Sequence, residues 1–163
     1  MDRGDGGRPL DIPWDVFYPA VKVRRLVLDT SVIASAFRSR NGASHAILVL
    51  VAQRRLVPLL TAALFLEYED VLKRPEQLRA AGLTPGQIDQ RLAAIASAAE
   101  PVTVHFRWRP QLSDPGDELV FEAAVNGRAD ALATHNIRHF ATAAPRFGLR
   151  VIRPGDLLQE LQA

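Results

Sequence analysis

The sequence predicts an α/β fold in which a parallel sheet of five strands is covered by helices on both faces. From Arg24 onward, short apolar runs typical of buried strands alternate with stretches of helical periodicity. Strands that are joined through helices form parallel sheets by right-handed crossovers. The chain has 163 residues, which is about the size of one domain. We therefore expect an N-terminal extension over residues 1–22, partly flexible because it begins with a Gly-, Asp- and Arg-rich stretch, and one domain over residues 23–163.

The expected strands are short apolar segments bounded by polar or turn-forming residues. The first is an apolar run that begins at Arg25 and ends in an acid, Asp29. Pro58 removes one hydrogen-bond donor from the second, which suggests a bulge or an outer position in the sheet. The third is indicated by alternating apolar and polar residues. The five segments are residues 25–29, 56–60, 102–106, 129–134 and 149–152.

The expected helices are indicated by their periodicity and by residues that favour helix ends. Thr30 or Ser31 can cap the first helix, and Pro85 favours the start of another. Asp114 begins a helix that stops at Gly127, because glycine is favoured at helix C-termini. The helices are expected over residues 30–37, 44–53, 62–72, 84–99, 114–127, 136–141 and 154–161.

The composition excludes several classes of protein. Hydrophobic residues make up 48% of the chain and charged residues 23%, as in ordinary globular proteins, which excludes a disordered or coiled-coil chain. No cysteine is present, which excludes disulfides, zinc–thiolate sites and cysteine nucleophiles. No apolar run approaches the roughly 20 residues of a membrane span, and no signal peptide is recognisable. We therefore expect a cytoplasmic protein with no membrane partner.

The cationic residues are almost all arginine. Lysine occurs only at Lys22 and Lys73, so eighteen of the twenty Lys and Arg residues are arginine. Arginine pairs with phosphate through two parallel hydrogen bonds, which lysine cannot do. The bias therefore favours a nucleic-acid partner about as strongly as it favours a GC-rich genome.

Five acids are candidates for chemistry, and each has a structural alternative. Asp29 ends an apolar run, where a carboxylate must be paired, hydrogen-bonded or metal-bound unless it caps a helix. Glu67 and Glu69 lie on opposite borders of the apolar stripe of their helix, and periodicity does not choose between them. Asp114 and Asp117 are explained equally well as the N-cap and the third residue of a helix.

The positions of these acids relative to the strands favour a shared site. In parallel sheets, ligands bind beyond the carboxyl ends of the strands, where the strand order reverses. Asp29 follows the first expected strand, and Thr134, His135 and Asn136 follow the fourth. If Asp29 meets Glu67 and Asp117, two carboxylates ~4 Å apart repel by about 4 kcal/mol, so the cluster must take up protons or bind a cation. Oxygen ligands alone favour Mg²⁺ or Mn²⁺, and Mg²⁺ bridges to phosphate oxygens, which points to phosphodiester hydrolysis.

Four segments carry the candidate residues, in the order 28–32, 67–72, 114–120 and 129–140. Together they resemble the PIN-domain family, and within it the VapC-like toxins of bacterial toxin–antitoxin systems. The resemblance implies a three-layer α/β/α fold and a metal-dependent endoribonuclease with Mg²⁺ or Mn²⁺ as cofactor and RNA as substrate. It also implies a cognate antitoxin and a homodimer, for which Trp14, Phe17 and Tyr18 are candidate contacts.

The resemblance also implies roles for individual residues. Asp29, Glu67 and Asp117 match the three acids that are catalytic and bind the metal, which selects Glu67 over Glu69. In the implied mechanism, an ion held by Asp29 and Asp117 activates a water that Glu67 positions. Supporting roles in orienting the water and the phosphate, or in capping, fall to Ser31, Asp114, Thr134 and Asn136.

Two positions depart from the family pattern. Many members have asparagine where this chain has Ser31, and a serine hydroxyl can take its place. Asn136 stands where a fourth acid is usual and supplies no charge, so one well-held ion is expected. The candidates for contacts with RNA are Arg38, Arg40, His135 and Arg138, for which a plain surface role is the somewhat more favoured alternative.

Two other functions remain open. A PIN fold could bind RNA or a protein partner with little or no cleavage, which the missing fourth acid favours. Alternatively, Asp29 could be the phospho-acceptor of a phosphatase or receiver-type domain, but no Asp-x-Asp pair follows the first strand.

Overall fold

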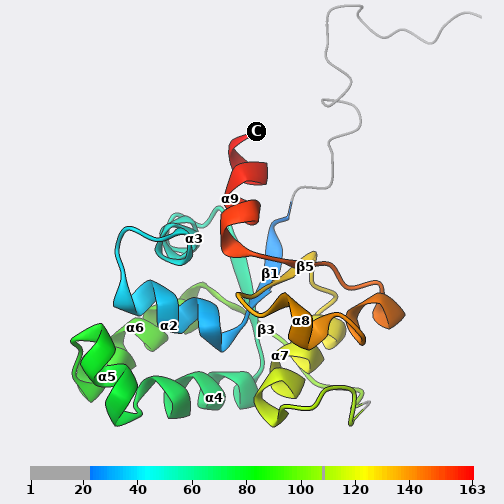
Figure 1. Ribbon diagram of the computed structural model, residues 1–163, viewed down its shortest axis with the longest axis horizontal. Coiled ribbons are helices and arrows are strands. Elements are labelled where there is room, and N and C mark those ends of the chain that lie inside the picture. Colours follow the sequence, from blue (N-terminus) through cyan, green and yellow to red (C-terminus); the bar gives the residue numbers. More distant parts are fainter. Residues whose placement is uncertain (1–22, 108) are drawn as a thin grey trace, which may run out of the picture.

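The computed structural model describes residues 23–107 and 109–163, and the strands in these residues form one parallel sheet (Figure 1). The order of the strands is β3-β2-β1-β4-β5, which confirms the expected five-stranded parallel sheet. Trp14, Phe17 and Tyr18, the candidate dimer contacts, lie outside the described residues. The strands are β1 (Arg25–Leu28), β2 (Val57–Leu60), β3 (Glu100–Pro101), β4 (Ala131–Ala133) and β5 (Val151–Ile152).

Helices cover both faces of the sheet (Figure 1). α2 packs against β1 and α6 against β2 on one face, while α7 packs against β1, β2 and β4 on the other. The architecture is therefore the three-layer α/β/α sandwich that the sequence predicts. Over the described residues the helices are α2 (Thr30–Arg38), α3 (Ala43–Ala52), α4 (Ala62–Leu72), α5 (Pro75–Ala81), α6 (Pro85–Ala98), α7 (Pro115–Asn126), α8 (Ile137–Phe140) and α9 (Pro154–Gln162), with a 3₁₀ helix at Ala144–Phe147.

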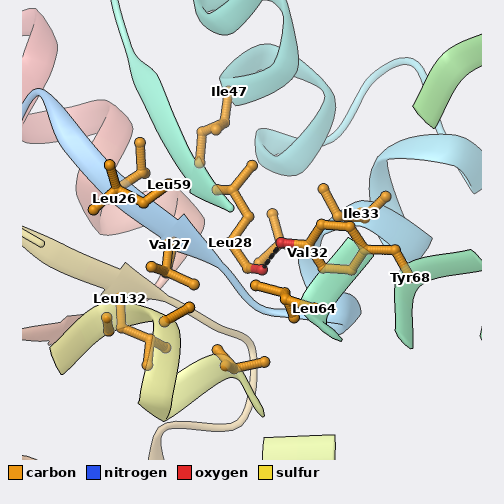
Figure 2. Close-up of a cluster of buried hydrophobic side chains, with 14 of the residues drawn as sticks. Leu26, Val27, Leu28, Val32, Ile33, Ile47, Leu59, Leu64, Tyr68 and Leu132 are labelled. Atoms are coloured by element: carbon orange, nitrogen blue, oxygen red, sulfur yellow. Dashed lines mark hydrogen bonds between the residues drawn. The ribbon is translucent and has the colours of Figure 1, made fainter. Parts of the chain in front are cut away.

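The core lies between the central strands and both helical layers. Leu26, Val27 and Leu28 of β1 are almost completely buried, as is the whole of β4. Burial on both faces explains why these strands are continuous apolar runs rather than alternating ones. Figure 2 shows β1 side chains packed against Ile47, Leu59 and Leu64 from neighbouring elements. None of the helices over the described residues is both long and apolar enough to cross a membrane.

The strand order reverses between β1 and β4. The chain proceeds from β1 outward to β2 and β3, and then returns to add β4 on the other side of β1. The residues that follow β1 and β4 are therefore adjacent, and the amide of Asp29 donates to the carbonyl of Ala133 at 2.9 Å. This is the position where open α/β sheets bind ligands.

The third strand differs from the expected segment. The expected strand over residues 102–106 is wrong: β3 comprises only Glu100 and Pro101. The amides of His105 and Phe106 instead donate to the side-chain oxygen of Asn126, at 3.0 and 3.1 Å. A side chain on α7 therefore satisfies a backbone that would otherwise need a neighbouring strand.

The expected outer position of Pro58 is also wrong, since β2 lies between β1 and β3. Pro58 pairs with Leu26 of β1, whereas β3 pairs only with Leu59 and Leu60. Proline is tolerated here because at Pro58 the strand has a neighbour on one side only.

Two helix ends differ from expectation. The N-cap of α2 is Asp29 rather than Thr30 or Ser31, and the Asp29 side chain makes no capping hydrogen bond. Gly127 ends α7 as expected, but in a right-handed conformation. A Cβ at Gly127 would lie 2.9 Å from the carbonyl of Ala123 and from a methyl of Leu59. Close packing, rather than a left-handed turn, therefore requires glycine at this position.

Candidate active site

Asp29 is a buried carboxylate held by two hydroxyl groups. Only 5% of its surface is exposed. Oδ2 accepts a hydrogen bond from Ser31 at 2.8 Å and another from Thr134 at 2.6 Å. The side chain makes no hydrogen bond to the backbone amides at the start of α2, so the two hydroxyl groups, and not the helix, fix the carboxylate. The alternative of a simple helix cap therefore does not explain Asp29.

The segment after β4 forms the second wall of the site. Thr134 is fully buried, and its hydroxyl accepts a hydrogen bond from the amide of Asn136 at 2.9 Å. The amide of His135 donates to the Ser31 hydroxyl at 3.3 Å. Ser31 and Thr134 thus connect Asp29 to this segment, which leaves the side chain of Asn136 exposed beside the acid.

Tyr68 fixes α4 across the end of β1. Its buried hydroxyl donates a short hydrogen bond to the carbonyl of Leu28, the residue before Asp29 (Figure 2). Burial, and then the charge of Asp29, raise the pKa of Tyr68 far above its ordinary value, so the hydroxyl remains a donor. Since Glu67 precedes Tyr68, this contact brings Glu67 to the end of β1.

The first turn of α7 brings the other acids to the same place. Asp114 is the N-cap of α7 and accepts hydrogen bonds from the amides of Gly116, at 2.7 Å, and Asp117, at 3.4 Å, so the expected cap is confirmed. A Cβ at Gly116 would lie 2.7 Å from Oε1 of Glu67. The Glu67 carboxylate therefore lies directly against this turn, where a larger side chain at position 116 would displace it.

The charge of Asp29 affects the other two predicted acids. Burial raises the pKa of Asp117, and the charge of Asp29 raises it further, while His139 lowers it. Burial is also the main cause of the raised pKa of Glu67, to which Asp70, Asp114 and Asp29 add and which Arg74 opposes. Asp29 thus acts on a carboxylate from each of two other elements, α4 and α7. Glu69, the alternative to Glu67, instead pairs with Lys73 at 3.1 Å.

The carboxylate oxygens of the predicted acids are suitable ligands for a hard divalent cation, although the side chains are too far apart to form a complete binding site. Within residues 23–107 and 109–163, no three His, Asp or Glu side chains are close enough together to form a metal-binding cluster. Mg²⁺ needs only one or two protein carboxylates, because it keeps several of its waters. The like charges of Asp29, Glu67 and Asp117 favour a cation, and every one of their ligand atoms is oxygen.

His139 is a residue that the sequence reasoning does not place at the acids. Its Nδ1, on α8, lies 2.9 Å from Oδ2 of Asp117 in the first turn of α7. The only sequence signal for this role is that His139 lies three residues after Asn136 and directly before Phe140. In the structure, Phe140 is fully buried and anchors α8. The signal is weak because a histidine in a four-residue helix is usually on the surface.

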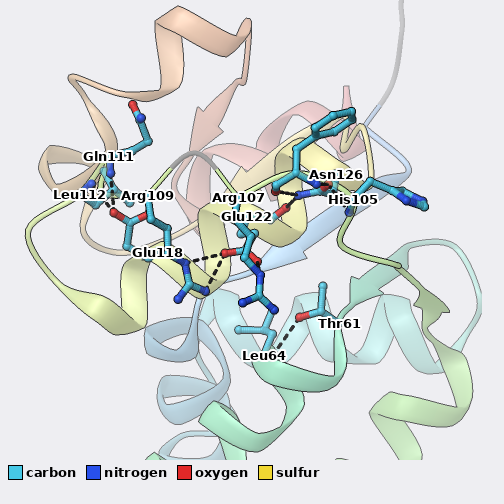
Figure 3. Close-up of polar contacts among 11 residues, drawn as sticks. Thr61, Leu64, His105, Arg107, Arg109, Gln111, Leu112, Glu118, Glu122 and Asn126 are labelled. Carbon is cyan, nitrogen blue, oxygen red and sulfur yellow. Dashed lines mark hydrogen bonds and ion pairs between the residues drawn. The ribbon is translucent and has the colours of Figure 1, made fainter.

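Two buried glutamates of α7 are further residues that the sequence does not reveal. Glu118 accepts hydrogen bonds from the amides of Gln111 and Leu112, at 2.5 and 2.7 Å (Figure 3). Glu122 pairs with Arg109 at 2.6 Å, and Arg107 lies 3.7 Å from it. These contacts hold the segment before Asp114 on α7, so Arg107 and Arg109 have a structural role.

The candidates for contacts with RNA fall into three groups. Arg38 and His135 line a cleft beside Asp29. Arg138 lines a second cleft, on the Asp117 side. Arg40 is exposed and lines neither cleft, so the structure does not bring it to the acids.

The raised pKa of Glu67 predicts that this carboxylate destabilises the metal-free protein at neutral pH. When the pKa of an acid is higher in the folded chain than in the unfolded chain, the protein loses stability as the pH rises. The loss occurs between the ordinary pKa, about 4.3, and the pKa in the folded chain. Glu67→Gln is therefore expected to raise the melting temperature by about 1–3 °C at pH 7 in EDTA, with no gain below pH 4. Differential scanning calorimetry across this pH range measures the difference.

Glu69→Gln is the matched control for this prediction, because it makes the same change two residues away on α4. It removes one of the two carboxylate partners of Lys73, the other being Asp89, so no gain is expected at pH 7. A melting temperature of Glu67→Gln equal to or below that of the unsubstituted protein at pH 7 would contradict the prediction.

Comparison with known proteins identifies the family. A family model described as the PIN domain matches residues 25–138, which contain all of the predicted site residues. Neither the search of curated proteins nor the search of solved structures found a match. PIN domains are generally nucleases. The match covers most of the chain and includes strands β1 to β4, so the chain belongs to the PIN-domain family.

Proposed function

We propose that this protein is an endoribonuclease that uses Mg²⁺ or Mn²⁺ to hydrolyse RNA phosphodiester bonds. The observation that carries the proposal is the convergence on Asp29. Its charge raises the pKa of both Glu67 and Asp117, which come from different helices. A fixed acid that acts on two others at the point where the strand order reverses is suited to hold a cation against a phosphate.

Each residue of the site has a separate role in the proposed reaction. Asp29 and Asp117 would hold the ion, which when bound polarises the scissile phosphate and lowers the pKa of water. The hydroxyls of Ser31 and Thr134 keep the Asp29 carboxylate in one orientation. Glu67 has a raised pKa and is suited to position the attacking water and to accept its proton. Asn136 is exposed beside them and can donate to a phosphate oxygen.

The biological role that we propose is that of the toxin in a toxin–antitoxin pair, with the cognate antitoxin as its protein partner and a homodimer as its assembly. The four segments that resemble VapC-like toxins support this role. Co-expression with the neighbouring reading frame tests it: a small protein that co-purifies and blocks RNA cleavage is the expected result.

RNA cleavage is the direct test of the activity. A labelled single-stranded RNA incubated with the protein and Mn²⁺ should be cut internally, and EDTA should abolish the cutting. The alternative is a PIN-fold module that binds RNA or a protein with little or no cleavage. It is favoured by Asn136 and by the lack of a three-residue cluster among the described side chains. RNA that is bound but remains intact in Mn²⁺ would support the alternative.

Metal binding is expected to stabilise the protein. At ten times its dissociation constant, an ion that binds only the folded state adds about 1.4 kcal/mol of stability. For a chain of this size, that raises the melting temperature by about 3–6 °C. Thermal melts with Mn²⁺ and with EDTA measure the difference. Asp117→Asn should reduce the shift, whereas an equal shift in this variant would place the ion elsewhere.

A further inference from the structure

We propose that the cleft beside Asp29 is a nucleotide subsite, which binds the RNA nucleotide next to the scissile phosphate and reads its base. The proposal rests on the proposed ribonuclease function. The cleft has a volume of about 470 Å³, within the range of pockets that hold small ligands. Its polar lining consists mainly of Ser31, Ser35, Arg38, Gln77, His135 and Asn136.

The position of the cleft places it next to the reacting phosphate. Ser31 lines the cleft and also donates to Asp29, and Asn136, which lines it too, donates through its amide to Thr134, the second donor to Asp29. On the far side of the acids, a second cleft of about 810 Å³ is lined by Asp117, Arg138 and His139. An RNA strand that crosses the acids therefore has room for a nucleotide on each side.

The charge of the first cleft suits a nucleotide better than that of the second. Its lining contains Arg38 and no carboxylate, whereas the second cleft includes Asp114 and Asp117. A guanidinium only donates hydrogen bonds and binds phosphate, while Gln77 and Ser35 can each donate to and accept from a base edge. The subsite thus combines one phosphate-binding group with two groups able to distinguish bases.

The walls of the cleft are held in place before any ligand binds. The ring of His135 lies 2.8 Å from the hydroxyl of Ser44, which is itself buried, and its amide donates to Ser31. Ser31, Ser35 and Arg38 lie along one face of α2 at helical spacing. Only modest rearrangement is therefore needed on binding.

RNA binding in EDTA tests the phosphate contact without cleavage. The probe is a fluorescein-labelled eight-nucleotide RNA of random sequence, titrated by anisotropy at several salt concentrations. Arg38→Ala should weaken binding about fivefold or more. It should also reduce the slope of the logarithm of the binding constant against the logarithm of the salt concentration by about 0.7, the value for one lost phosphate contact with single-stranded nucleic acid. Arg79→Ala is the control: Arg79 lies two residues from Gln77 on α5, is exposed, and does not line the cleft. Equal weakening by both variants, or no weakening by Arg38→Ala, would overturn the subsite.

Sequencing of cleavage products tests base recognition. When a random RNA pool is cut in Mn²⁺, Gln77→Ala should relax the base preference at one position next to the cut. Arg79→Ala should leave the preference unchanged. Unaltered preference in Gln77→Ala would overturn base reading by this cleft. The outcomes distinguish the two proposals. If Arg38→Ala weakens binding but the unsubstituted protein cleaves no RNA, only the nuclease proposal is overturned. If the protein cleaves RNA but Arg38→Ala leaves binding unaltered and Gln77→Ala leaves the base preference unaltered, only the subsite proposal is overturned.

Discussion

Asp29→Asn is expected to lower the rate of RNA hydrolysis about 100-fold or more while the protein remains folded. The substitution removes the charge that fixes a cation at the end of β1, and metal ions contribute several kcal/mol of transition-state stabilisation. About 2.7 kcal/mol corresponds to 100-fold. Asparagine keeps an oxygen that can accept hydrogen bonds from the hydroxyls of Ser31 and Thr134, so the local structure is retained. Initial rates on a labelled RNA in Mn²⁺ measure the loss.

A second measurement on Asp29→Asn does not depend on activity. The charge of Asp29 raises the pKa of Glu67 and of Asp117, so both pKa values should fall in the variant. Carboxyl carbon NMR across a pH titration in EDTA detects the change.

The matched control is Asp156→Asn, which makes the same substitution at an exposed position in the first turn of α9. It should cleave RNA at close to the original rate. If Asp29→Asn cleaved RNA as fast as this control, Asp29 would have no part in the reaction.

The elements that the sequence predicts well are those whose local signal agrees with their place in the fold. β1 is a continuous apolar run because it is buried on both faces, and α7 begins at Asp114 because this residue caps it through two amides. The sheet is parallel, as strands joined through helices predict, and its observed order brings Asp29 beside Thr134. The positions of these residues directly after two strands are therefore enough to single them out, whereas the crossover rule does not fix which strands are neighbours.

The parts that the sequence does not predict depend on contacts between distant residues. α5 is not expected because it is short and none of its residues is fully buried; only Leu78 and Ala81 pack partly against the core, too few for an apolar stripe. The third strand is misplaced because Asn126 of α7 satisfies the amides of His105 and Phe106. Likewise, the contact of His139 with Asp117 depends on how α8 packs, which no local pattern specifies.

The choice between Glu67 and Glu69 also illustrates this limit. Both lie on the borders of one apolar stripe, and family resemblance rather than periodicity selects Glu67. In the structure, the hydrogen bond of Tyr68 to Leu28 sets the rotation of α4, which directs Glu67 to the turn at Gly116 and Glu69 to Lys73. The rotation of this helix therefore determines which acid reaches the site.

Leu64→Ala is expected to lower the free energy of unfolding by about 2–5 kcal/mol, because it leaves a cavity beneath α4. Leu64 is fully buried and lies one turn before Tyr68 on the inward face of the helix. The backbone amide of Leu64 donates to the Thr61 hydroxyl, and alanine keeps this capping bond (Figure 3). Urea denaturation followed by circular dichroism measures the loss.

Leu66→Ala is the matched control, because it makes the same change two residues away on the same helix. Leu66 is 62% exposed, so a change within about 0.5 kcal/mol is expected. The pair reports the rotation of α4: Leu64 and Glu67 are three residues apart and share one side of the helix, whereas Leu66 faces away. A loss for Leu66→Ala as large as that for Leu64→Ala would mean that α4 is rotated, and Glu67 would then no longer face Asp29.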